Sequence, residues 1–196
     1  MSILRSLALL PLLVASSSAF AATYQVDASH SRVGFSVSHM MVSTVRGEFG
    51  TVAGTVDYDP ANVAATRVSA TVGVPSIDTR DAKRDDHLRS PEFFDAVKFP
   101  EMKFTSKAVK NVTPTTFDLV GDLTIRGVTK EVTFKVNKLA ADRKDPWGNT
   151  KSGTRATATI NRQDFGITWN NTLDGGGVLV GDEVTIELDV ELNKNK

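Results

Sequence analysis

Alternation of apolar and polar residues dominates the chain from residue 24 onward. A period of two places successive side chains on opposite faces of a β-strand. Segment 116–125 is the clearest case, because Phe117, Leu119 and Leu123 alternate with Asp118 and Asp122. Eight segments follow this pattern: residues 24–39, 46–58, 67–77, 101–112, 116–125, 128–136, 152–161 and 183–192. The pattern therefore predicts an all-β protein.

Eight neighbouring antiparallel strands with one apolar face each can stack as a sandwich or close as a barrel. The alternation is compatible with both. The predicted strands exceed the usual length of about five or six residues, and long strands suit the tilted geometry of a barrel. Arg126-Gly127 also predicts a tight hairpin turn between two sequence neighbours. We therefore expect an eight-stranded antiparallel up-and-down barrel.

The segment 78–100 interrupts this strand pattern. It is charged, poor in β-branched residues and long enough for a helix. Asp78 or Thr79 can cap this helix, Asp81 falls in its first turn, and Pro91 follows its end. We expect one helix-containing insertion between the third and fourth strands.

The first 21 residues have the pattern of a secretory signal. Arg5 precedes the apolar run 7–15, and the small-x-small triplet Ala19-Phe20-Ala21 ends the segment. The run is shorter than the roughly 20 residues that a membrane-spanning helix needs. We expect a signal peptide over residues 1–21, a mature domain over residues 22–196, and a soluble periplasmic protein without a transmembrane segment.

Composition excludes several classes of chemistry. Lys plus Arg and Asp plus Glu both number 23, so a nucleic-acid partner is not expected. The absence of Cys excludes thiol nucleophiles and cysteine metal sites. His30 and His39 would lie about 30 Å apart on one extended strand, too far to share a metal ion. With no Ser–His–acid pattern, we predict no catalytic residues and no metal.

An ordered series of residues over the whole mature chain resembles the YceI-like family of exported proteins. The series comprises Asp27, His30-Ser31, Phe35, His39, Gly47, Phe49, Arg80-Asp81, His87-Leu88, Ser90-Pro91, Phe93-Phe94-Asp95, Pro100, Phe104, 121–124, Gly127, 161–166 and Trp169. The resemblance implies a lipocalin-like eight-stranded barrel, often dimeric, whose interior holds a long isoprenoid or similar lipid. It also implies that His30 belongs to a structural motif at the end of the barrel.

An eight-stranded barrel is just wide enough to be filled by side chains or to hold one slender ligand. Strand parity predicts ten lumen-facing ligand contacts: Phe35, Val37, Phe49, Val72, Met102, Phe104, Leu119, Leu123, Phe134 and Ile186. A bulge in any strand would invert its set. Small strand residues leave lumen volume wherever they face inward: Gly34, Gly54, Ala70, Ala108, Gly121, Ala156 and Ala158. In strand 101–112, Ala108 is expected on the same face as Met102 and Phe104.

A second group of residues is predicted to surround the mouth of the lumen. It consists of Arg84, His87, Phe93, Phe94 and Trp169. Arg84 or His87 could hydrogen-bond the head group of a ligand, although a solvated charged helix explains the same residues. Arg162 and Asp164 are predicted to form an ion pair that fixes the turn before Trp169.

Three functions are compatible with these patterns. The favoured one is a periplasmic carrier or scavenger of an isoprenoid or polyprenyl quinone that needs no cofactor beyond this bound lipid. The second is a stress-related dimeric interaction protein with a barrel filled by its own side chains, and with Trp147 and Phe165 as candidate contacts. The third is a hydrolase or isomerase that acts on a lipid head group. A lumen too small for a methylene chain would favour the second.

Overall fold

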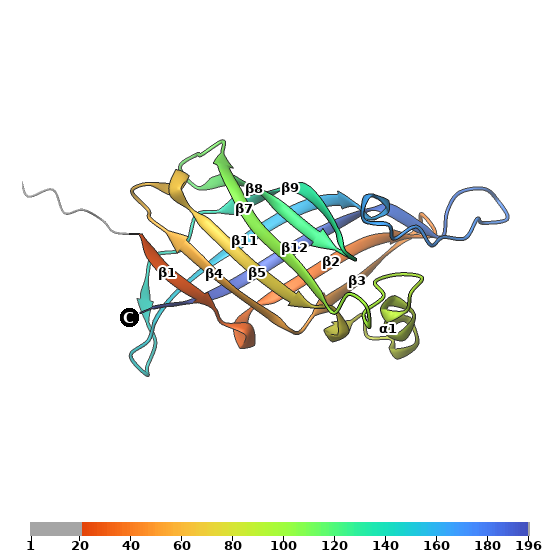
Figure 1. Cartoon of the computed structure of the whole chain (residues 1–196), viewed down its shortest axis with the longest axis horizontal. Helices are drawn as coiled ribbons and strands as arrows, with labels where there is room; N and C mark the ends of the chain where they lie inside the picture. The colour runs from red at the N-terminus through yellow and green to blue at the C-terminus, as the bar shows by residue number, and fades with distance from the viewer. Residues whose placement is uncertain (1–20, 196) are drawn as a thin grey trace, which may run out of the picture.

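The computed structural model describes residues 21–195. The predicted signal peptide therefore lies outside the described residues, apart from Ala21. The described chain forms one antiparallel sheet that closes on itself, with a short helix at one end of the barrel (Figure 1).

The first three predicted strands are each divided into two. Local breaks at Ala28–His30 (η1), at residues 50–51 and at Val74–Ser76 (η3) bend these long strands. Each half pairs with a different neighbour or with a different part of the same neighbour. The halves are β1 (Ala22–Val26) and β2 (Arg32–His39), β3 (Ser43–Phe49) and β4 (Val52–Tyr58), and β5 (Arg67–Gly73) and β6 (Ile77–Asp78).

The remaining long strands are close to their predicted bounds. They are β7 (Glu101–Lys110), β8 (Thr116–Ile125), β9 (Val128–Asn137), β11 (Thr150–Asn161) and β12 (Val180–Lys194), with the short β10 (Arg143–Lys144) paired to β11. The other elements are α1 (Ala82–Arg89), η2 (Val63–Ala65) and η4 (Arg162–Phe165). The insertion with α1 lies between the third and fourth long strands, as predicted.

Closure comes from β12, which pairs with β11 on one side and with β1 and β2 on the other. Sequence neighbours pair around the rest of the circle. The predicted eight-stranded antiparallel up-and-down barrel is confirmed. Among the long strands, β9 pairs with β11 through only Ala156↔Val136 and Thr157↔Lys135. The η4 turn packs beside β9 and β12.

One end of the barrel is packed shut by its own side chains. Tyr24, Tyr58, Phe117 and Leu192 are all at most 4% exposed and belong to one hydrophobic cluster. The opposite end carries α1 and the loop that follows it (Figure 1).

The helix begins later than the sequence pattern predicted. Asp81 is the N-cap, and its carboxylate accepts a hydrogen bond from the backbone N–H of Arg84 at 3.1 Å. The predicted caps Asp78 and Thr79 are therefore wrong. Arg80 has a φ of 64°, so the chain turns sharply between these residues and the helix.

A β-bulge in β7 corrects the predicted parity of this strand. Phe104 pairs with Leu123, but the register shifts between Ser106 and Ala108. Beyond the shift Val109 pairs with the inward Leu119, whereas Ala108 pairs with Val120 on the outer face. Since cross-strand partners share a face, the prediction that Ala108 faces the lumen is wrong.

Candidate functional site

The barrel encloses an apolar cavity of about 260 Å³. Its wall includes Val184, Ile186 and Leu188 of β12, which point inward yet remain only partly buried. Leu192, on the same face of the same strand, is 0% exposed because it lies in the packed end. The partial exposure of inward apolar side chains therefore comes from unfilled space inside the barrel.

All ten residues predicted to face the lumen lie on the wall of this cavity. They come from seven strands and surround the interior from every side. The alternation predicts their orientation correctly because none of the ten lies beyond a β-bulge that would turn it to the other face. Their contact with a ligand stays a prediction. The ten are Phe35, Val37, Phe49, Val72, Met102, Phe104, Leu119, Leu123, Phe134 and Ile186.

The small strand residues contribute less volume than expected. A Cβ added to Gly121 would lie 2.5 Å from Cζ of Phe104, and one added to Gly47 would lie 2.5 Å from Cζ of Phe35. The two glycines thus allow aromatic rings to lie across the strands. A Cβ on Gly34 would meet the guanidinium of Arg32 instead, so Gly34 does not open the lumen.

Three of the small residues border the cavity: Gly34, through its backbone, and Ala70 and Ala156. Gly54 is packed closely, since a Cβ there would lie 2.7 Å from the carbonyl oxygen of Ser69. Ala158 is 7% exposed and belongs to the packed core.

Polar groups on the wall already have partners within the protein. The hydroxyl of Thr66 donates to the carbonyl of Val63 at 2.7 Å, and that of Thr154 donates to the carbonyl of Asn137 at 2.7 Å. The Lys103 ammonium forms an exposed ion pair with Glu101 at 3.2 Å. The cavity therefore presents an almost wholly apolar surface to an occupant.

Arg162 is the one strongly polar residue of the wall that is buried among the described residues, at 4% exposure. Its guanidinium donates to Asp182 at 3.2 Å rather than to the exposed Asp164, so the predicted Arg162–Asp164 pair is wrong. Burial lowers the pKa of Arg162, and the charge of Asp182 opposes this effect. The remaining N–H groups donate to the carbonyls of Ile167, Trp169, Val180 and Gly181 at 2.7 to 3.4 Å.

Of the residues predicted for the rim, Phe93 and Phe94 line the cavity. The ring of His87 packs edge-on against Phe93 and Trp169, with centroid distances of 4.9 and 5.0 Å. Nε2 of His87 is 2.7 Å from a carboxylate oxygen of Glu92. His87 and Trp169 thus connect α1 to the loop after η4 and do not themselves border the cavity.

Two arginines hold the other parts of this rim. Arg84 donates to the hydroxyl and carbonyl of Thr79, both at 2.8 Å, and does not border the cavity. Arg126, in the predicted tight turn, donates to the carbonyl of Gly166 and to that of Pro91, the latter at 2.6 Å. The β8–β9 turn, the loop after α1 and the segment after η4 are therefore tied together.

Several cavity residues were missed by the sequence analysis. The alternation already contained the signal for those in strands, since Val33, Val184 and Leu188 share a face with predicted residues. Leu88 of α1 and Phe165 of η4 carry no such signal, because their inward position depends on how non-strand segments pack against the barrel.

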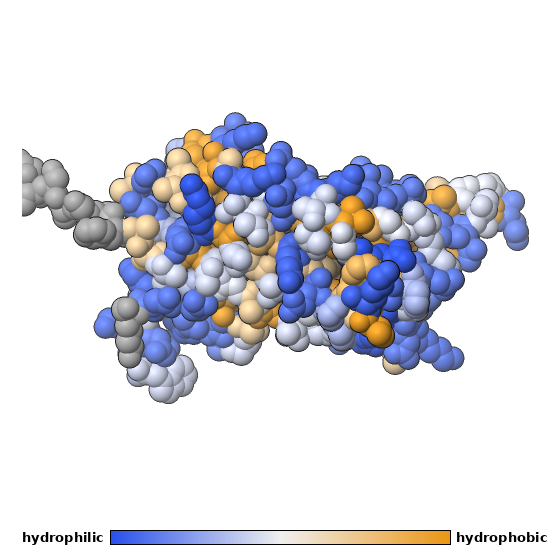
Figure 2. Space-filling view, in the orientation of Figure 1, coloured by the Kyte–Doolittle hydropathy of each residue, from blue (hydrophilic) through white to orange (hydrophobic). Residues whose placement is uncertain are grey.

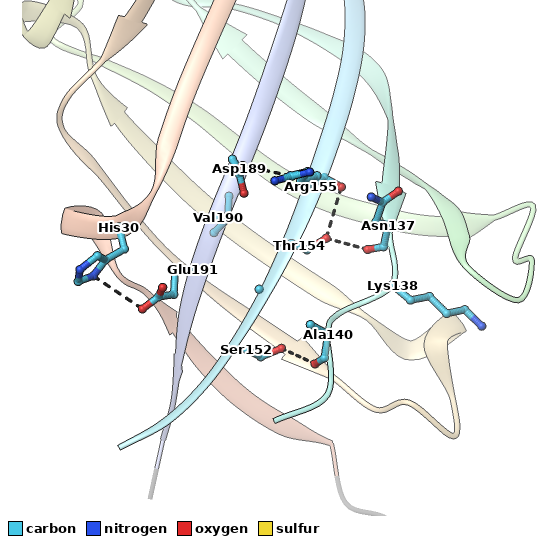
Figure 3. A pocket seen from close by; sticks show the side chains of 11 residues that line it. His30, Asn137, Lys138, Ala140, Ser152, Thr154, Arg155, Asp189, Val190 and Glu191 are labelled. Atoms are coloured by element: carbon cyan, nitrogen blue, oxygen red, sulfur yellow. Dashed lines mark hydrogen bonds and ion pairs between the residues drawn. The ribbon is translucent and has the colours of Figure 1, made fainter. Parts of the chain in front are cut away.

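A second depression is lined by residues of β11 and β12, by Asn137, Lys138 and Ala140 at and after the end of β9, and by His30 (Figure 3). It is a shallow groove of about 400 Å³ with a polar surface. Its side chains mostly pair with one another: Nε of Arg155 is 3.0 Å from the carboxylate of Asp189, and Ser152 donates to the carbonyl of Ala140 at 2.7 Å. The polar side chains of the groove are therefore largely satisfied within the protein.

Asp27, His30 and Glu191 bring three potential metal ligand atoms within 4.8 Å of one another. The Lys151 ammonium lies 2.5 Å from Asp27 and 3.0 Å from Glu191, so it already pairs with both carboxylates of this cluster. Its hydrogen bond, together with those from Ser29 and His30, holds the pKa of Asp27 below its usual range. The same carboxylate accepts the N–H of Ser29 and caps η1. These contacts support a structural role for His30 and its neighbours.

Within residues 21–195, no helix has the length and apolar character needed to cross a bilayer. Trp147 is 84% exposed, whereas Phe165 is 2% exposed in the core. Phe165 is therefore not available as the surface contact that the dimer hypothesis assigned to it.

The fold and the cavity define the class: an antiparallel eight-stranded barrel, closed at one end, with an apolar lumen of ligand size. The sequence model of the YceI-like domain family matches residues 24–192. The chain belongs to the YceI-like family. A UPF0312 protein of Pseudomonas putida strain W619 is 40% identical over 164 residues, which cover 83% of this chain and 85% of the relative. Protein YceI of Salmonella newport is 41% identical over 159 residues, covering 80% and 82%.

Solved structures share the same fold. Burkholderia cenocepacia BcnA superposes with a TM-score of 0.74 at 26% identity, covering 85% of this chain and 98% of that protein. A polyisoprenoid binding domain from Saccharophagus degradans superposes with a TM-score of 0.64, covering 89% and 99%. Its identity is 14%, so this likeness concerns the fold alone.

Proposed function

We propose that this protein is an exported carrier that binds an isoprenoid chain in the lumen of its barrel. The observation that carries the proposal is the apolar cavity of about 260 Å³, in which the inward side chains Val184, Ile186 and Leu188 remain partly exposed. An unfilled apolar surface of this kind is stabilised by an apolar occupant, at about 25 cal/mol for each Å² removed from water. The polyisoprenoid binding domain that shares the fold supports the choice of ligand class.

The polar groups of the wall favour a ligand recognised through its chain. The hydroxyls of Thr66 and Thr154 and the guanidinium of Arg162 already donate to protein acceptors. A ligand head group inside the lumen would have to break one of these hydrogen bonds, which is unfavourable. We therefore expect the head group, a quinone or an alcohol, to remain at the α1 end while the chain enters.

The volume of the cavity limits what it holds without rearrangement. At roughly 30 Å³ for each water-sized group, 260 Å³ accommodates on the order of nine such groups. A polyprenyl chain is longer, so its remainder must lie in the mouth or displace movable rings such as those of Phe35 and Phe104. We propose that these rings turn aside from Gly47 and Gly121 when a long chain enters.

A pair of substitutions on β12 tests this site. Ile186 faces the cavity, whereas Glu187 is exposed on the outer face of the same strand. We expect Ile186→Trp to fill the lumen and to lower the stoichiometry of lipid recovered by organic extraction by about tenfold or more. Glu187→Trp adds the same ring outside and should leave the recovered lipid unchanged.

Mass spectrometry of the extracts, with thermal unfolding as a check of folding, provides the measurement. Equal lipid recovery from both folded variants would contradict binding in the lumen. Organic extracts of both variants and of the unsubstituted protein that contain no lipid, together with no uptake of an added isoprenoid alcohol, would instead favour an interaction protein.

A further inference from the structure

Two loops project beyond the barrel at the end that carries α1 (Figure 1). The β2–β3 turn contains Met40, Met41 and Val42, whose exposed fractions are 41%, 64% and 82%. The loop before β12 adds Val178, which is 40% exposed. We refer to these four residues as the apolar tip. Large apolar side chains gathered on one projecting surface indicate an interaction site.

Direct contacts join the two loops into one unit. The backbone N–H of Met40 donates to the carbonyl of Leu179 at 2.8 Å. A Cβ on Gly177 would collide with the terminal methyl of Met41 and lie 3.0 Å from its sulfur, so the thioether rests directly on this glycine. Gly177 also has a φ of 97°, which a residue with a side chain rarely adopts. The apolar tip is therefore a built surface of the folded protein.

The fold alone does not require methionine in this turn. Met40 and Met41 have φ angles of 53° and 60°. Positive φ at both central positions is typical of type I′ turns, which favour Asn-Gly. The chain thus carries two strained residues with exposed apolar side chains where an unstrained polar pair would close the same hairpin. Such an outlier indicates a function for the side chains themselves.

The apolar tip is continuous with the wall of the cavity. Val180 directly follows Leu179, pairs with His39 of the same hairpin and lines the lumen. Val37, two residues before His39, also lines it. Segment 36–45 contains no Lys, Arg, Asp or Glu, and segment 167–181 contains only Asp174. A surface with few charges, which includes the apolar tip, therefore leads from the outside of the molecule to the ligand cavity.

We propose that the apolar tip inserts into the interface of a phospholipid bilayer, where the isoprenoid chain passes between the membrane and the lumen. This inference rests on the proposed function, because a bilayer is the reservoir of such a ligand. With no Lys or Arg in either segment, attachment depends on apolar burial rather than on anionic lipids. Binding should therefore occur on neutral vesicles and persist at high salt.

Flotation with neutral phosphatidylcholine vesicles at low and high salt tests the proposal. We expect the unsubstituted protein to float at both, and Met41→Asp with Val42→Asp to lower the bound fraction by about tenfold or more. Trp147→Asp is the matched control, because Trp147 is 84% exposed but lies outside the apolar tip. It should float like the unsubstituted protein.

A second variant separates membrane binding from misfolding. Met40→Asn with Met41→Gly supplies the residues that the turn prefers, so the Tm should rise while the vesicle-bound fraction falls. Uptake of detergent-solubilised farnesol reports on the lumen and should be unchanged. Equal flotation of both tip variants and the unsubstituted protein would overturn the membrane proposal, whereas failure of the unsubstituted protein to take up farnesol would contradict the proposed function separately.

Measurement of the oligomeric state tests whether the apolar tip instead binds a second copy of the protein. If the unsubstituted protein is a dimer that the tip substitutions convert to a monomer, and it fails to float, then the apolar tip is an interface between two copies. That result would also overturn membrane insertion.

Discussion

A single side chain, Arg162, organises the end of the cavity nearest to α1. Its guanidinium has a hydrogen-bonding partner for every N–H group, which is the condition under which a buried charge is tolerated. Four of its acceptors are backbone carbonyls, two in the segment before β12 and two in β12 itself. The planar fork of arginine, rather than positive charge alone, suits this set of acceptors.

We expect Arg162→Lys to destabilise the protein although it keeps the charge. A lysine has three donors on one atom. It cannot reach the acceptors in the segment after η4 and those in β12 at once, so several carbonyls lose their partners. The free energy of unfolding should fall by about 2 kcal/mol or more, measured by chemical denaturation. Arg155→Lys, in an exposed pair, should change it by less than about 1 kcal/mol. Similar small effects for both would contradict the role assigned to Arg162.

At the scale of elements, polar contacts connect segments that the barrel itself does not pair. At the α1 end, Arg126 links the β8–β9 turn to the loop after the helix. At the opposite end, Lys151 of β11 connects the break between β1 and β2 to β12 through Asp27 and Glu191. Tyr24 donates to Asp142 there, and burial raises the pKa of Tyr24 to about 12.

The pair between Asp27 and Lys151 predicts a dependence of stability on pH. The pKa of Asp27 is lowered in the folded protein, mainly by its hydrogen bond with Lys151. Its contribution is therefore fully present above the unfolded pKa of about 3.9 and is lost as the pH falls from there toward the folded pKa.

Asp27→Asn should lower the free energy of unfolding at neutral pH by about 1 kcal/mol, while the cap of η1 is retained by the amide oxygen. The difference from the unsubstituted protein should shrink below about pH 4, as measured by thermal unfolding across pH. Asp174 is exposed and forms no ion pair with the other described residues. Asp174→Asn should therefore not change the dependence of stability on pH. A difference that stays constant down to acid pH would contradict the account.

At the scale of the whole molecule, the sequence pattern predicted the barrel and ten residues of its inner face. Period-two alternation is a property of each strand, so Phe35, Leu119 and Ile186 could be placed inside without knowledge of the fold. It failed at Ala108, because a bulge adds one residue to a strand without changing its composition. It also missed the partners of Arg162, since backbone carbonyls of a later loop leave no mark in the sequence.

The closure of the barrel and the exposure of its surface residues depend on how the strands and loops pack in three dimensions. The resemblance to the YceI-like family is confirmed, and the closed barrel follows from the pairing of β12 with both β11 and β2. The predicted periplasmic location, bound quinone and dimer stay predictions. Figure 2 shows apolar residues at several places on the surface. Their exposure depends on the folded structure and could not be predicted from the sequence pattern.

The central claim is that the lumen holds an isoprenoid chain, and native mass spectrometry of the protein purified from its own host tests this most directly. Bound molecules would be released and identified by fragmentation. The account predicts one isoprenoid per chain, lost in Ile186→Trp and retained in Glu187→Trp. A bare polypeptide at its calculated mass, which also takes up no isoprenoid when one is supplied, would contradict it.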